Sequence, residues 1–227
     1  MGSMKRTLVA IVTIVACLGA GASPAAARTT ELGNVLTDTG MTPSCPSSPC
    51  LAVTKTTGYQ FTAGTRRTIF IAPRTGRVVA FTLKLGRPSA RQIEFFNQQA
   101  GGTAKARIAI LRPARGSRSN EYKFLLNAQS EDYNLQEHFG RTVQFPLRTT
   151  LLARQGWVVA LSVPTWAPVL AVNGLDNTFA WRASRVRPCS TNPESQPPHL
   201  APGTVKQYFC TYRPARLTYT ATLISTP

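Results

Sequence analysis

The residues with the greatest capacity for chemistry lie in one short segment, SEDYNLQEHFG. It holds Glu131, Asp132, Glu137 and His138, in a chain with only nine acidic residues and two histidines. Two carboxylates about 5–10 Å apart are what a glycosidase requires. The oxygens of Asp132, Asn134 and Glu137 would also suit Ca²⁺, although their spacing does not match an EF-hand loop. We favour the simpler interpretation, a solvated connection between two strands that carries ordinary surface charges.

Other catalytic patterns have less support. A serine hydrolase would need His138 or His199 as its base, and His199 lies in a Pro-rich segment. The sequence contains no G-x-S-x-G motif and no phosphate-binding Gly-rich loop. We therefore expect a protein that is not an enzyme and has no cofactor. An extracellular hydrolase that uses the Glu131–His138 cluster is kept as an alternative.

Two of the three tryptophans lie in the stretch GWVVALSVPTWAP. Trp157 opens a run that is apolar on both faces, which predicts a central strand with Trp157 in the core. Pro164 and Pro168 flank Trp166, so we expect the strand to end at Pro164 and Trp166 to project from a rigid turn. There the indole would either stack on a sugar ring or fold back as a plug, with its N–H on a loop carbonyl. The apolar residues that follow favour the plug.

The elements that must position these residues are mainly strands. Apolar and polar residues alternate with a period of two in many short runs, which Gly and Pro turn signals separate. One segment, residues 89–100, instead predicts a short helix with Ser89 as N-cap and Gly101 as its stop. We predict an all-β fold: a two-sheet antiparallel sandwich, jelly-roll-like, with this one short helix. An immunoglobulin-like sandwich stays open. The clearest alternating runs are 77–85, 104–111, 121–127, 142–147 and 216–224.

Four cysteines follow the first 27 residues: Cys45, Cys50, Cys189 and Cys210. An even number of cysteines in an exported protein indicates disulfides, and four cysteines allow three pairings. We prefer Cys45–Cys50, which closes the tight CPSSPC loop, and Cys189–Cys210, which closes a long polar loop. A loop of the second size stabilises by about 3 kcal/mol in the chain-entropy model. No arrangement of these cysteines suggests a metal site.

The N-terminus has the order of a secretory signal peptide. Lys5 and Arg6 precede an apolar run at residues 8–18, and small residues lead to a cleavage site after Ala27. A run of eleven residues is too short for a membrane span, which needs about 20. We expect a secreted protein without a transmembrane segment. The alternative is a lipid anchor at Cys17, because residues 14–17 resemble a lipobox.

The mature chain is long enough for one domain and is strongly basic. We expect residues 1–27 to be the signal peptide, residues 28–50 a loop segment with the small disulfide, and residues 51–227 a single β-sandwich domain. Loss of the signal removes two basic and no acidic residues, which lowers the net charge from +17 to +15. Such a charge favours an anionic envelope polymer as partner. The basic residues are dispersed, so we expect no specific nucleic-acid binding.

The export signal, the alternating strands and the late GWVVAL strand together resemble secreted β-sandwich proteins of bacteria. These include jelly-roll modules similar to carbohydrate-binding domains. The resemblance implies a non-catalytic protein that binds an extracellular glycan or cell-envelope polymer. Its candidate ligand-binding residues here are Trp166, Asp132, Asn134, Glu137 and His138. A basic adhesion or structural envelope protein that acts by charge alone is the alternative, and the sequence leaves the oligomeric state open.

Overall fold

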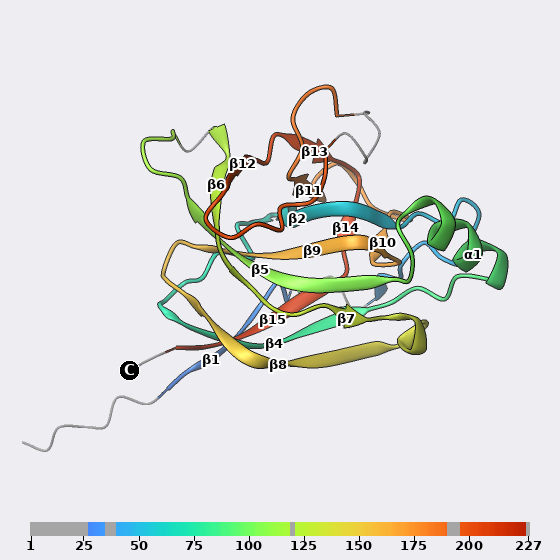
Figure 1. Ribbon diagram of the computed structural model, residues 1–227, viewed down its shortest axis with the longest axis horizontal. Coiled ribbons are helices and arrows are strands. Elements are labelled where there is room, and N and C mark those ends of the chain that lie inside the picture. Colours follow the sequence, from blue (N-terminus) through green and yellow to red (C-terminus); the bar gives the residue numbers. More distant parts are fainter. Residues whose placement is uncertain (1–26, 35–39, 119–120, 190–195, 226–227) are drawn as a thin grey trace, which may run out of the picture.

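A computed structural model describes residues 27–34, 40–118, 121–189 and 196–225. Two β-sheets face each other, and the single α-helix of the described residues lies at one end (Figure 1). The four-stranded sheet, here the small sheet, has the order β1-β15-β4-β8, and the large, nine-stranded sheet has the path β12-β6-β5-β9-β2-β11-β13. All strand pairs are antiparallel. The predicted all-β sandwich is therefore confirmed.

The strands of the small sheet are β1 (Thr29–Leu32), β15 (Tyr219–Ser225), β4 (Gly76–Lys84) and β8 (Thr142–Ala153). The path of the large sheet comprises β12 (Val205–Gln207), β6 (Lys123–Gln129), β5 (Lys105–Pro113), β9 (Val158–Ala167), β2 (Val53–Ala63), β11 (Ala180–Ala183) and β13 (Cys210–Tyr212). Off this path, β3 (Arg66–Arg67) pairs with β2 and β7 (Tyr133–Asn134) with β5, while β10 (Leu170–Ala171) and β14 (Arg216–Leu217) form a separate ladder. The helices are α1 (Ala90–Gln99) and a 3₁₀ turn (Gln136–His138).

The strand order is that of a jelly roll. The chain passes repeatedly between the sheets: β1, β4, β8 and β15 lie in the small sheet, while β2, β5, β6 and β9 lie in the large one. The order β1-β15-β4-β8 opposite β2-β9-β5-β6 makes the two interlocked Greek keys of that fold. The short strands β11 and β13 extend the large sheet beyond β2.

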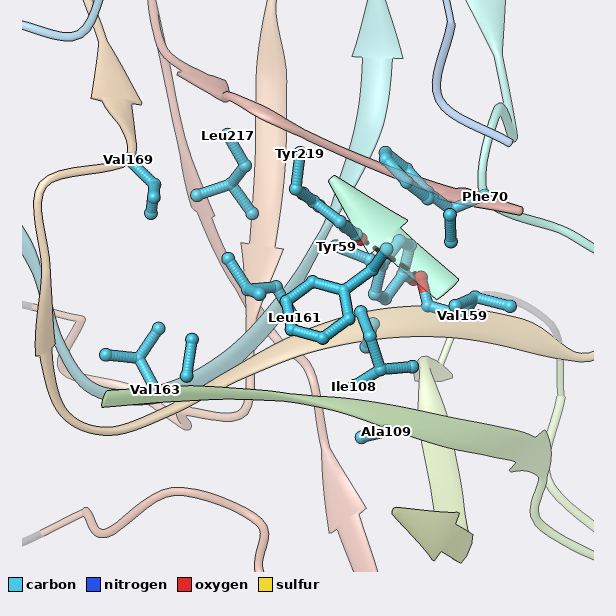
Figure 2. Packing of buried hydrophobic residues seen from close by; sticks show 14 of the residues in the cluster. Tyr59, Phe70, Ile108, Ala109, Val159, Leu161, Val163, Val169, Leu217 and Tyr219 are labelled. Atoms are coloured by element: carbon cyan, nitrogen blue, oxygen red, sulfur yellow. Dashed lines mark hydrogen bonds between the residues drawn. The ribbon is translucent and has the colours of Figure 1, made fainter. Parts of the chain in front are cut away.

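The core lies between the two sheets. Figure 2 shows Val159, Leu161 and Val163 of β9 on the side that faces Leu217 and Tyr219. All five side chains are at most 2% exposed. The Tyr219 hydroxyl donates a hydrogen bond to the Val159 carbonyl at 3.0 Å, so its polar end is satisfied inside the core. Each such apolar side chain stabilises the fold by about 1.5–3 kcal/mol on burial.

The period-two alternation predicts most inward positions correctly, with one exception in β4. In β5, Ala106, Ile108 and Ile110 are all fully buried, as predicted. In β4 we expected Val79 to share the inner face, but Val78 is the fully buried residue. The β4–β8 register shifts between Val78 and Ala80, and such an irregularity moves side chains to the other face.

Pro164 does not end its strand, which corrects the sequence prediction. β9 continues to Ala167 and pairs with β2 on both sides of the proline. The register between β2 and β9 shifts at Lys55, whose φ is +39°, and pairing with β5 has ended at Ser162. A bulge supplies a place in the ladder where no backbone N–H is required, so the proline is tolerated.

The helix and both disulfides are confirmed. Ser89 caps α1 and forms a capping box with Gln92, as its hydroxyl accepts from the Gln92 N–H at 3.3 Å. The bonded cysteines are Cys45–Cys50 and Cys189–Cys210. Residues 1–26 of the proposed signal peptide, Cys17 among them, lie outside the described residues. Part of the expected N-terminal loop, residues 29–32, forms β1. Within the described ranges, no helix is long and apolar enough to cross a membrane.

Candidate functional site

Two members of the predicted acidic cluster hold neighbouring strands together. The Glu131 carboxylate accepts hydrogen bonds from the Tyr133 hydroxyl at 2.8 Å and from the Arg148 N–H at 3.3 Å. Burial favours the neutral carboxyl, but these hydrogen bonds outweigh it and hold the pKa of Glu131 below its usual value. Asp132 forms an ion pair with Arg107, Nε to Oδ1, at 2.6 Å. Both acids are therefore engaged in structural contacts.

The remaining members of the cluster are dispersed. Asn134 lies on β7 opposite Lys105, and it lines an open hollow with Gln136 and Glu137. His138 Nε2 is 3.5 Å from the Glu137 carboxylate, and its ring packs edge-on against Phe145. No three His, Cys, Asp or Glu side chains of the described residues gather where they could hold a metal ion. The geometry thus provides no support for the Ca²⁺ hypothesis.

Trp166 is a plug, the favoured of the two interpretations, and the alternative of an exposed stacking platform is wrong. The side chain is fully buried, and its ring stacks on Phe96 of α1 with centroids 4.8 Å apart. The indole N–H donates to Asn97 Oδ1 and to the Gly102 carbonyl, each at 3.0 Å. The indole is therefore inaccessible to a ligand. Trp157, expected in the core, is only partly buried, with the Arg154 guanidinium over its ring.

A pocket of about 500 Å³ lies away from the predicted site residues. We call it the aromatic pocket. It is lined by Phe70 and two pairs of rings at alternate positions, one pair on β2 and one at the start of β6. Its rim lies near the β5–β6 connection, at the end of the sandwich opposite α1 (Figure 1). Its lining includes the rings of Tyr59, Phe61, Phe70, Tyr122 and Phe124, together with Thr68, Ser117, Arg118 and Lys123.

Two Y-x-F segments build the walls of the aromatic pocket. In a strand, residues two apart point to the same face, so Tyr59 and Phe61 of β2 project together. Tyr122 precedes β6 with a φ of +49°, and its ring lines the pocket with that of Phe124. The pairs meet in reverse order: Tyr59 contacts Phe124 with centroids 5.8 Å apart, and Phe61 contacts Tyr122 at 5.9 Å. Both contacts are edge-to-face, with interplanar angles of 81° and 83°. Such pairs contribute about 0.5–1.5 kcal/mol each beyond burial.

Arg182 of β11 braces two of these rings. Its guanidinium carbon lies 3.4 Å from the Tyr122 ring centroid and 4.7 Å from that of Phe61. Its Nη1 donates to the carbonyls of Tyr208 and Phe209, each at 3.3 Å, which anchors the cation. Cation–π contacts of this kind are worth about 0.5–2 kcal/mol. The two ring planes are therefore held in place before any ligand arrives.

The Tyr59 hydroxyl is a polar group of the pocket that the described part of the fold leaves without a hydrogen bond. Tyr59 is 5% exposed, yet its hydroxyl has no hydrogen-bond partner among the described residues. By contrast, the buried hydroxyls of Tyr219 and Tyr208 lie within hydrogen-bond distance of the Val159 carbonyl and His199 Nδ1. Burial raises the pKa of Tyr59, although Arg182 opposes the shift, so the phenol stays protonated and able to donate.

The backbone is also strained at the pocket. Among the described non-glycine residues, only Lys55, Thr68 and Tyr122 have a positive φ. Lys55 belongs to the bulge described above, but Thr68 (φ +57°) and Tyr122 (φ +49°) both line the aromatic pocket. Such conformations cost about 1–3 kcal/mol each and cluster at binding and active sites.

The chemical groups at the pocket are suited to binding. Its described lining offers aromatic faces, hydroxyls and the cations Arg118 and Lys123, and includes no carboxylate or imidazole. This arrangement can stack on a flat or ring-shaped group and donate hydrogen bonds to it. Comparison with known proteins finds no matching family model, no matching curated protein and no matching solved structure.

Proposed function

We propose that this is an exported, non-catalytic binding protein that holds a saccharide ring of an extracellular or cell-envelope glycan in the aromatic pocket. The observation that carries the proposal is the unpartnered Tyr59 hydroxyl in a pocket walled by aromatic rings. This function is the one expected from the sequence, but its site is at the opposite end of the sandwich from Trp166.

A saccharide ring matches the pocket in shape and in polarity. Its C–H face packs against an aromatic face, while its hydroxyls seek hydrogen-bond partners at the edge. The edge-to-face ring pairs supply such faces, and the Tyr59 hydroxyl supplies a donor. The volume of about 500 Å³ falls within the range of about 300–1,000 Å³ that is typical of small-ligand sites. Because Arg182 fixes two of the rings, little ordering is required on binding.

Two further features support export and the absence of catalysis. Two disulfides are characteristic of proteins that fold in an oxidising compartment, which agrees with the signal-like N-terminus. Glu131 and Asp132, two of the carboxylates considered for catalysis, are engaged with Tyr133, Arg148 and Arg107. A hydrolase that uses this cluster would first have to break those contacts.

The test compares two tyrosine variants that each lose one hydroxyl. Tyr59→Phe removes the unused hydroxyl, so we expect about tenfold weaker glycan binding and no loss of stability. Tyr219→Phe removes a hydroxyl bonded to Val159 and should cost about 1 kcal/mol of stability without any effect on binding. Affinity electrophoresis on a panel of neutral and acidic polysaccharides, followed by calorimetry, measures binding. If the wild type binds a glycan and Tyr59→Phe binds it equally well, the proposed site is wrong.

A further inference from the structure

We infer that the glycan is acidic, and that its anionic group lies in a cationic groove beside the aromatic pocket. This inference rests on the proposed function and names the class of ligand. The groove, here the basic groove, has a volume of about 380 Å³. The part of its lining that we use consists of Arg112, Arg115, Glu121, Lys123, Leu125 and Val205.

The basic groove and the aromatic pocket share two lining residues, Ser117 and Lys123, so a ring in the pocket and a neighbouring group in the groove could belong to one molecule. The residues of β6 alternate, so Phe124 points inward to the pocket while Lys123 is exposed. A chain of linked sugars is a molecule that can occupy both spaces at once.

The floor of the basic groove is a row across three strands. Arg112 of β5 lies opposite Leu125 of β6, and Leu125 lies opposite Val205 of β12. Val205 is 49% exposed, which is unusual for a valine on a strand. A mildly apolar floor with cations beside it suits the face of a sugar that carries an acid group at its edge. Arg112 is held by its strand, whereas Arg115 comes from the β5–β6 connection.

The charged residues that line the aromatic pocket and the basic groove are mainly positive. Arg112, Arg115, Arg118 and Lys123 line the pocket or the groove, and Glu121 is the one described acidic residue that does so. Glu121 Oε2 lies 3.1 Å from Lys123 Nζ and so balances the charge of one of these four cations. Cations in a partly enclosed groove concentrate anionic ligands more effectively than the same charges dispersed on a flat surface. Carboxylate and phosphate oxygens are the groups that arginine binds best.

The pocket favours a polysaccharide over a single-stranded nucleic acid. Nucleic-acid sites present successive aromatic platforms along a strand. Here Tyr59, Phe70 and Phe124 are each at most 9% exposed and lie within one pocket, which would accept one ring only. Carboxylate-bearing and phosphate-bearing glycans both carry the anionic oxygens that arginine binds. Separate binding measurements with each class show which of the two the protein prefers.

The experiment uses a groove variant and a charge-matched control. Arg112→Gln/Arg115→Gln removes two groove cations, while Arg74→Gln/Arg91→Gln removes two exposed cations elsewhere. Binding to polygalacturonate, to polyglycerol phosphate, to a neutral oligosaccharide that the wild type binds and to single-stranded DNA is measured at 50 and 300 mM salt. We expect the groove variant to bind the acidic polymer about tenfold more weakly at low salt, with a flatter salt dependence. The control should change by less than about twofold.

The outcomes separate this inference from the function on which it rests. If the groove variant and its control behave alike, while Tyr59→Phe still weakens binding, the pocket stands and the acidic ligand is wrong. If both double variants weaken acidic polymers equally and Tyr59→Phe has no effect, dispersed charge is responsible and both proposals fail. Both proposals would also fail if the wild type bound single-stranded DNA as tightly as the acidic polysaccharides and Tyr59→Phe did not change that binding. Loss of the acidic ligand in the groove variant, with the neutral ligand retained, is the result that supports the inference.

Discussion

Replacement of Trp166 should damage stability and leave ligand binding intact. The indole extends from β9 and is fully buried against Phe96 of α1 and Phe139, so Trp166→Ala removes a large core side chain and leaves a cavity. Changes of this type cost about 3–5 kcal/mol, a large part of the about 5–15 kcal/mol that stabilises a typical domain. Trp166→Phe keeps most of the ring but leaves Asn97 Oδ1 and the Gly102 carbonyl without their donor. That change should cost about 1–3 kcal/mol.

Urea denaturation followed by far-ultraviolet circular dichroism measures these effects without using the fluorescence of the residue that is changed. Trp157→Phe is a suitable control, because Trp157 is only partly buried and its loss should cost less than about 1 kcal/mol. Glycan binding by Trp166→Phe should equal that of the wild type. If Trp166→Phe instead kept its stability and lost glycan binding, our assignment of a structural role to Trp166 and of binding to the aromatic pocket would be wrong.

Two further predictions concern stability. Removal of the Cys189–Cys210 bond, with both cysteines changed to Ala, should lower the free energy of unfolding by about 3 kcal/mol. The same change at Cys45 and Cys50, which close a shorter loop, should lower it by about 2 kcal/mol, and denaturant titration measures both values. Burial lowers the pKa of His199, so below its ordinary value of 6.5 the unfolded imidazole takes up a proton that the folded one does not. Stability should therefore fall as pH decreases from 6.5, and His199→Gln should flatten that slope in urea midpoints measured between pH 7.5 and 5.

The sequence predicted those parts of the fold that depend on local pattern. Alternating residues identify β5 and β15 because one face of each strand meets the core, and Ser89 identifies the start of α1 because its side chain caps a nearby N–H. The error at Pro164 has a non-local origin. A proline ends a strand only if its partner strand requires the missing N–H, and the bulge at Lys55 of β2 removes that requirement. The partner strand is about a hundred residues away, and its register leaves no mark beside the proline.

The aromatic pocket was missed for the same reason, although a local signal existed. Tyr59–Phe61 and Tyr122–Phe124 are two copies of Y-x-F, and the second was interpreted only as part of the alternating run 121–127. Their significance depends on the arrangement of the large sheet, which brings β2 and the start of β6 to one pocket although they are not adjacent in its strand order. Arg182, which braces the rings, comes from a third strand, β11. No spacing in the sequence connects these three segments.

Trp166 and Tyr59 differ in whether their polar atoms have hydrogen-bond partners within the fold. Both are almost completely buried, so exposure alone does not separate them. The indole N–H of Trp166 has two acceptors, and any ligand would have to displace contacts that already satisfy it. The hydroxyl of Tyr59 has none among the described residues and lines a pocket, so it is available to a ligand that enters there. For this reason we propose binding for the pocket of Tyr59 and a structural role for Trp166.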